Sequence, residues 1–189
     1  MCAFSPRRHT SRPPEVAKLV EVLHRLDVRY ILVGSVAAAA YGIDVDPGDF
    51  DVVPDLDAAN LDRLILALRD LEAAAYGPFG SWNLTDTGRW KWVARPTPDE
   101  ELAEWSPDAR DVDSLDHLFV TRLGNFDVMP RIAGRYETLR PRAVRRDWHG
   151  CDLHVACVDD LLAALTVADR AKDRRRVAAL QEIRTEARS

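Results

Sequence analysis

The sequence has few cysteines, few lysines and no long hydrophobic run. Three cysteines in 189 residues are too few for the disulfide framework of a small secreted protein. The longest stretch poor in charge, residues 30–43, contains glycine and serine and is too short to cross a bilayer. The first residues carry arginines but no apolar segment behind them, so they do not resemble a secretory signal. We therefore expect a cytoplasmic protein without membrane contact.

The segment HGCDLHVAC brings together four side chains of zinc-ligand type, His149, Cys151, His154 and Cys157. We expect an extended strand here, in which alternation puts His154 on the opposite face from the other three, so four ligands do not converge. At about 3.3 Å per residue, the Cα atoms of Cys151 and Cys157 would lie roughly 20 Å apart, too far for a disulfide. We interpret both cysteines as buried structural thiols.

Two nucleotide-binding motifs are also absent. The first expected strand is followed neither by the glycine spacing of dinucleotide-binding folds nor by the Lys-Ser/Thr of a P-loop. The sequence also has no internal repeat and no low-complexity tract. Dehydrogenases that bind dinucleotides and P-loop NTPases are thereby excluded.

Hydrophobic periodicity predicts helices alternating with strands, which is typical of an α/β or α+β domain. A flexible tail (1–13) would precede the core (14–157), and a C-terminal helical segment (158–189) would pack on it. Asp57 is the expected cap of the third helix. The expected helices cover residues 14–27, 35–42, 58–75, about 159–169 and 173–187. The expected strands cover residues 29–34, 49–54 and 88–96, the last with Trp90 and Trp92 on one face. Two hairpins are also expected: one has strands 117–122 and 126–130 with a turn at Gly124-Asn125, and the other turns at His149-Gly150.

Charge is unevenly distributed along the chain. Residues 121–189 carry 14 Lys and Arg against 10 Asp and Glu, whereas the whole chain has a net charge of -5. This uneven charge has two alternative explanations: the basic residues lie on ordinary solvated helix faces, or the basic C-terminal third faces a polyanion. The segment 97–116, with eight acids and one arginine, is a solvated loop or short helix, a lid, or a docking site for a partner.

Asp49 and Asp51 stand two residues apart on an expected strand, so their side chains leave the same face. Phe50 and Val52 then point into the core. Two neighbouring carboxylates repel each other unless a cation joins them, and hard Mg²⁺ prefers such oxygen ligands. The simpler alternative is a strand end with two solvated aspartates.

Two further features favour a metal site. The Gly34-Ser35 turn leads directly into a helix, where backbone N–H groups can receive an anion. Asp127, in NFDVMP, lies on a later strand that can run beside the Asp49–Asp51 strand. Three carboxylates beside a phosphate cradle suit nucleotidyl transfer with two metal ions.

The segment VGSVAAAAYGIDVDPGDFDVV resembles the signature of the polymerase-beta-like nucleotidyltransferases, in which Gly-Gly or Gly-Ser precedes an Asp-hydrophobic-Asp strand by a helix and a short loop. The thirteen residues between Ser35 and Asp49 suit that signature. Near the C-terminus, VDDLLAALTVADRAKDRRRVAAL is similar to the closing helices of the AbiEii-type abortive-infection branch, whose Arg-x-Lys-Asp turn corresponds to DRAKD, residues 169–173.

The resemblance implies a minimal nucleotidyltransferase fold, a mixed sheet flanked by helices, and a Mg²⁺-dependent enzyme with an NTP as substrate. It further implies the toxin of a toxin–antitoxin pair that modifies the 3′ end of tRNA and has a cognate antitoxin. The implied site residues are Gly34 and Ser35 for the nucleotide phosphates, Asp49 and Asp51 for Mg²⁺, Asp127 as third metal-binding carboxylate and base for the acceptor hydroxyl, Lys172 for the triphosphate or acceptor, and Asp173 for the local turn.

The chain departs from the family pattern in two places. No basic residue stands shortly before Asp49, and Leu165 occupies a position where relatives often have a basic side chain. Arg122 or Arg131 is expected to compensate. Other acceptors are a small molecule of aminoglycoside type, for which the acidic segment would be suitable, or a protein hydroxyl that receives AMP; a catalytically silent nucleotide sensor is the alternative outside enzymes.

Overall fold

The computed structural model describes residues 12–75, 80–84, 86, 90–94, 106–131, 134–168 and 173–186. Its helices are α1 (Val16–Arg25), α2 (Gly34–Ala40), α3 (Ala58–Asp70), α5 (Tyr136–Leu139), α6 (Val158–Ala168) and α7 (Arg174–Glu186), with 3-10 turns η1 (Val112–Ser114) and η2 (Arg140–Arg142). Its strands are β1 (Tyr30–Leu32), β2 (Phe50–Pro54), β3 (Ala74–Ala75), β4 (Gly80–Leu84), β5 (Trp90–Ala94), β6 (Leu118–Thr121), β7 (Gly124–Val128), β8 (Val144–Trp148) and β9 (Cys151–Val155).

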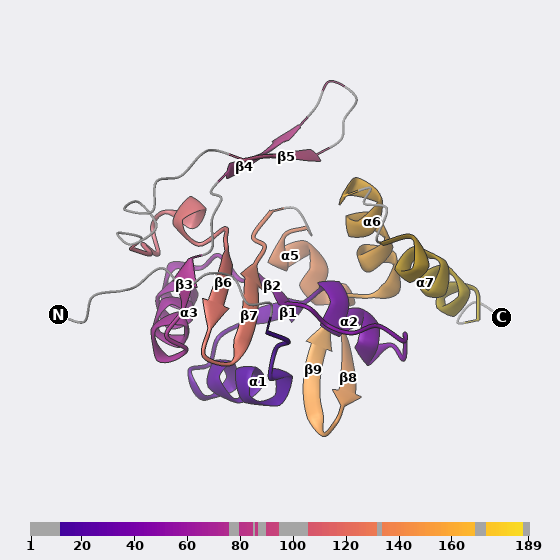
Figure 1. Ribbon diagram of the computed structural model, residues 1–189, viewed down its shortest axis with the longest axis horizontal. Helices are drawn as coiled ribbons and strands as arrows, with labels where there is room; N and C mark the ends of the chain where they lie inside the picture. Colours follow the sequence, from indigo (N-terminus) through magenta and orange to yellow (C-terminus); the bar gives the residue numbers. More distant parts are fainter. Residues whose placement is uncertain are drawn as a thin grey trace.

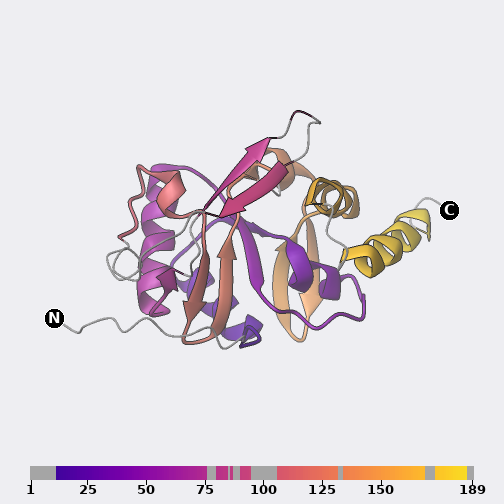
Figure 2. The same ribbon diagram turned by 45° about the horizontal axis from the view of Figure 1, so that its top comes forward.

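Seven of these strands form one mixed sheet in the order β3-β6-β7-β2-β1-β9-β8. The pairs β2–β7 and β1–β9 are parallel, and the other neighbours are antiparallel. The β4–β5 ribbon is separate from this sheet, and α6 and α7 lie together at one end of the molecule (Figure 1, Figure 2). The expected α/β fold class is therefore confirmed.

The core is built on the sheet face that carries Phe50, Phe119 and Phe126, all fully buried. The rings of Phe50 and Phe126 lie 5.5 Å apart between centroids. The helices α1 and α3 pack against each other and contribute their apolar faces to the same core. The other face of β2 and β7 carries the candidate site.

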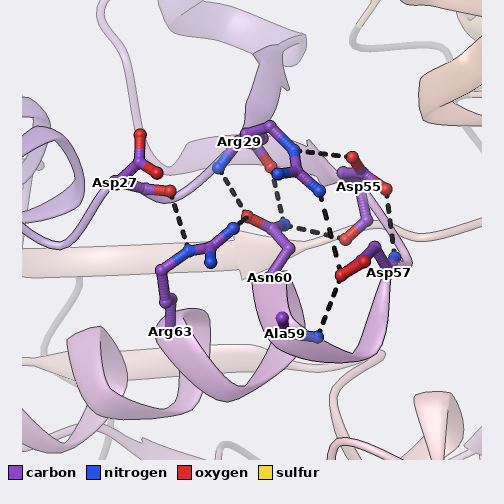
Figure 3. A network of polar contacts seen from close by, with 7 residues as sticks. All are labelled: Asp27, Arg29, Asp55, Asp57, Ala59, Asn60 and Arg63. Carbon is purple, nitrogen blue, oxygen red and sulfur yellow. Dashed lines mark hydrogen bonds and ion pairs between the residues drawn. The ribbon is translucent and has the colours of Figure 1, made fainter.

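A polar network joins the start of β1 to the end of β2 and to α3 (Figure 3). Asn60 is fully buried, accepts a hydrogen bond from Arg29 N at 2.7 Å and donates to the carbonyl oxygens of Arg29 and Asp55 at 2.9 and 2.8 Å. Asp57 caps α3, as expected, because its side chain accepts from Ala59 N at 3.0 Å. The network joins β1 to β2 at the end of β2 away from Asp49 and Asp51.

Replacing Asn60 with leucine is expected to lower the free energy of unfolding by about 3 kcal/mol, because the buried Asn60 side chain makes three hydrogen bonds to main-chain groups that leucine cannot replace. Urea unfolding with an unchanged m-value would measure the loss. The exposed Asp62 on the same helix is the control, since Asp62→Asn should change stability by less than about 0.5 kcal/mol. A loss no larger than that of the control would show that the network does not hold β1 and β2 together.

The first hairpin turns at Arg122 and Leu123, so the prediction of a turn at Gly124-Asn125 is wrong. Thr121 Oγ1 stabilises this turn, since it accepts from Leu123 N and donates to Gly124 O. Gly124 belongs to β7, with φ +105, and a Cβ there would lie 2.5 Å from the Pro13 carbonyl oxygen. The glycine thus serves the close approach of the N-terminal segment rather than the turn.

The second hairpin does turn at His149-Gly150, as predicted. Both residues have positive φ, 51° and 80°, as in the type I′ turns that suit two-residue hairpins. The strand β9 ends at Val155, so it is shorter than expected, and both Cys151 and Cys157 are half-buried free thiols instead of fully buried ones. The Cys157 thiol lies 3.1 Å from Asp160 Oδ2.

The helix predicted over 58–75 is shorter than expected: α3 ends at Asp70, Glu72 has a positive φ of 53°, and residues 74–75 form β3, which pairs with β6. The remaining predicted elements are present where the structure describes them. The strand over 90–94 is formed, although the side chains of Trp90 and Trp92 lie outside the described residues, as does the first part of the acidic segment, residues 97–105. The two closing helices are α6 and α7. Within the described ranges, no helix combines the length and the apolar character needed to span a membrane.

Candidate functional site

The structure brings the three predicted carboxylates together on one face of the β2–β7 pair. These strands are parallel, and Asp51 is directly opposite Asp127 in their register. Asp49 lies two residues before Asp51, so it shares that face, whereas Phe50 and Val52 point into the core, as predicted. Neighbouring strands are about 4.8 Å apart, so these three side chains are within reach of one small ligand.

Gly34 and Ser35 lie against the second of these carboxylates. Ser35 N donates to Asp51 Oδ2 at 3.3 Å, and Ser35 Oγ donates to the carbonyl oxygen of Asp49 at 3.3 Å. A Cβ at Gly34, where φ is +66, would lie 1.9 Å from Asp51 Oδ2. Glycine is therefore required here for the Asp51 carboxylate to lie where it does.

Asp51 has a second role that the sequence did not reveal. The residue before α2, Val33, has no side-chain oxygen to cap the free N–H groups of the helix. The Asp51 carboxylate reaches across from β2 and accepts one of them. The expected anion cradle thus receives a carboxylate of the chain itself.

Asn125 is a site residue that sequence reasoning missed. It is 2% exposed, and its Nδ2 donates to Asp49 Oδ1 at 2.9 Å. It lies two residues before Asp127 on β7, so both share one strand face. In the sequence, Asn-Phe-Asp places Asn125 two residues before Asp127. This spacing indicates a shared strand face only once Asn125 is known to lie in a strand.

The donor set fits a hard divalent cation, since it consists of three carboxylates and one neighbouring amide. Within the described ranges, no three Asp, Glu, His or Cys side chains already converge as metal ligands. The hydrogen bond from Ser35 N contributes to this, because it turns the Asp51 carboxylate toward the start of α2. Like charges also repel each other without a cation between them.

The C-terminal candidate residues are described only in part. Lys172 lies outside the described residues. Asp173 is 1% exposed, with Oδ1 at 3.6 Å from Arg176 Nη1, so it is anchored at the start of α7. The contact of Lys172 with a triphosphate or an acceptor stays a prediction.

The two arginines expected to compensate for missing basic residues are engaged by other carboxylates. Arg122 lies at the β6–β7 turn, with Nη2 at 3.6 Å from Asp70 Oδ2. Arg131 forms ion pairs with Asp113 and Asp116 of the acidic segment. Arg131 lies beyond the C-terminal end of β7. Because β7 runs parallel to β2, and β2 runs antiparallel to β1, this end of β7 is far from α2, which follows β1.

His117, beside that ion-pair cluster, makes stability depend on pH. Burial lowers its pKa to about 4, against the opposing effect of Asp113 and Asp111. Between about pH 6.5 and pH 4 the unfolded state binds a proton that the folded state does not, so stability falls as pH falls. His117→Gln is expected to remove this part of the loss, measured as the difference between urea unfolding curves at pH 7 and pH 5. Parallel pH profiles for the variant and the wild type would contradict it.

No protein-family model matches the chain, and no curated protein matches it at a significant level.

Proposed function

We propose that the protein is a Mg²⁺-dependent nucleotidyltransferase of the polymerase-beta-like superfamily. The observation that supports this most is the register that sets Asp51 opposite Asp127 on the face shared with Asp49. Gly34 and Ser35 next to Asp51 add the glycine and hydroxyl that the family signature has at this point. The proposal combines this geometry with the resemblance of residues 33–53.

In the proposed reaction an acceptor hydroxyl oxygen attacks the α-phosphorus of an NTP. A new P–O bond forms, the bond to the β-phosphate breaks, and pyrophosphate leaves with the electron pair. Asp127 takes the proton of the attacking hydroxyl. Asp49, Asp51 and Asp127 would hold Mg²⁺, which supplies charge stabilisation for the triphosphate and lowers the pKa of the hydroxyl. Gly34 and Ser35 would lie beside the nucleotide phosphates, as the family signature implies.

Within this class we propose the toxin of a toxin–antitoxin pair, with the 3′ end of tRNA as acceptor and a cognate antitoxin as partner. The likeness of the C-terminal segment to the AbiEii-type branch supports it. Exposed arginines on η2 and β8, among them Arg140 and Arg146, add positive charge that can follow an RNA backbone. If RNA is the acceptor, its binding should weaken steeply with salt, whereas a flat salt response would contradict this acceptor.

The test incubates the full chain with each α-labelled NTP, Mg²⁺ and total RNA, and resolves the products on a gel. Label in tRNA-sized bands, dependent on Mg²⁺, is the expected result. Label in proteins or in small molecules would support nucleotidyl transfer and contradict tRNA as the acceptor. The absence of transfer to any acceptor, with nucleotide still bound, would leave a silent nucleotide-binding module.

A further inference from the structure

We propose that Asn125 is a positioning residue of this site, which holds the Asp49 carboxylate in the orientation that binds a divalent cation. The inference rests on the proposed function and adds to it a residue outside the family signature. It starts from one contact, the hydrogen bond from Asn125 Nδ2 to Asp49 Oδ1 at 2.9 Å.

The placement of Asn125 follows from the strand register. Phe50 is opposite Phe126, so the residues one position earlier, Asp49 and Asn125, are neighbours across the same two strands. Asp51 and Asp127 form the next pair on this face. The four side chains thus make a square in which three are carboxylates and the fourth is an amide.

An amide at this corner is chemically suited to the task. It donates to one oxygen of Asp49 and leaves the other oxygen available to a cation. It also adds no negative charge, whereas a carboxylate here would be the fourth in the square. Carboxylates that bind metals are in general held by such outer hydrogen bonds.

Asn125 is itself firmly placed. Its backbone N donates to the carbonyl oxygen of Arg12 at 3.3 Å, and Gly124 before it packs against Pro13 and Pro14. Its side-chain oxygen is buried and has no hydrogen-bond partner in the described part of the chain. A buried amide with one unsatisfied atom stabilises a fold poorly, so the contact with Asp49 matters more for orientation than for stability.

The test measures Mn²⁺ binding to the full chain by electron paramagnetic resonance, together with thermal unfolding. Asn125→Leu keeps the volume and loses the donor, and it should weaken Mn²⁺ binding about 10- to 100-fold with a small change in Tm. Asn60→Leu is the matched control, a buried asparagine remote from the site, which should lower Tm and keep the wild-type Mn²⁺ affinity. Asn125→Ser, too short to reach Asp49, replaces the leucine variant if that one does not fold.

Wild-type affinity for Mn²⁺ in both Asn125 variants would overturn the role of Asn125 and leave the proposed function standing. Failure of the wild-type protein itself to bind Mn²⁺ would overturn both. If the Asn125 variants bind Mn²⁺ more weakly but the wild-type protein transfers no nucleotide, the positioning role is supported and only the proposed enzymatic activity is contradicted.

Discussion

Asp51→Asn is expected to reduce nucleotidyl transfer by about 10³-fold or more, while the free energy of unfolding falls by less than about 1 kcal/mol. Asparagine has the same shape and keeps an oxygen that can accept the Ser35 N–H, so the cap on α2 persists. It lacks the negative charge that the proposed cation needs. The transfer rate and a urea unfolding curve measured on the same preparation test both parts.

The control for this variant is Asp55→Asn, which follows the other end of the same strand directly. Asp55 pairs with Arg29, with Arg29 Nε at 2.8 Å from Asp55 Oδ2, and takes part in the network of Figure 3. Its replacement should affect stability and leave transfer unchanged. Transfer by Asp51→Asn at more than a tenth of the wild-type rate would mean that Asp51 is only the cap of α2.

Gly34→Ala is expected to lower transfer about 100-fold, because the new methyl group would occupy the place of the Asp51 carboxylate. Its Cβ would lie 1.9 Å from Asp51 Oδ2 and 2.4 Å from Asp51 Cγ, so the aspartate has to turn away. The positive φ of 66° adds about 1 to 2 kcal/mol of backbone strain. Transfer rate and thermal unfolding measure the two effects separately.

The variant Gly42→Ala distinguishes the steric clash with Asp51 from the backbone strain of a positive φ. Gly42 also has a positive φ, +86, but a Cβ there meets nothing within 4 Å. Both alanine variants should lose similar stability through strain, and only Gly34→Ala should lose transfer. Equal transfer in the two variants would contradict the placement of Asp51 against Gly34.

Much of the fold was predictable because it follows from local rules. The Asp57 cap, the I′ turn at His149-Gly150 and the two faces of β2 each depend on residues within a few positions of each other. The same alternation put Asp49 and Asp51 on one face. The place of Asp127 beside them required a strand order, which the sequence suggested but did not determine.

The parts of the site that escaped sequence reasoning depend on contacts between distant segments. Gly124-Asn125 has the composition of a turn, yet Pro13 occupies the space beside Gly124 and shifts the turn to Arg122 and Leu123. That shift places Asn125 in β7, opposite Asp49. Likewise, nothing local indicates that α2 takes its cap from Asp51 on a neighbouring strand.

The most direct measurement is a crystal structure of the protein with Mn²⁺ and an NTP analogue that resists cleavage between the α- and β-phosphates. We expect an anomalous Mn²⁺ peak in coordination with Asp49, Asp51 and Asp127, with the triphosphate bound to the same ion beside Gly34 and Ser35. Nucleotide bound at another place, or the three carboxylates without Mn²⁺ at saturating concentration, would contradict the proposed function.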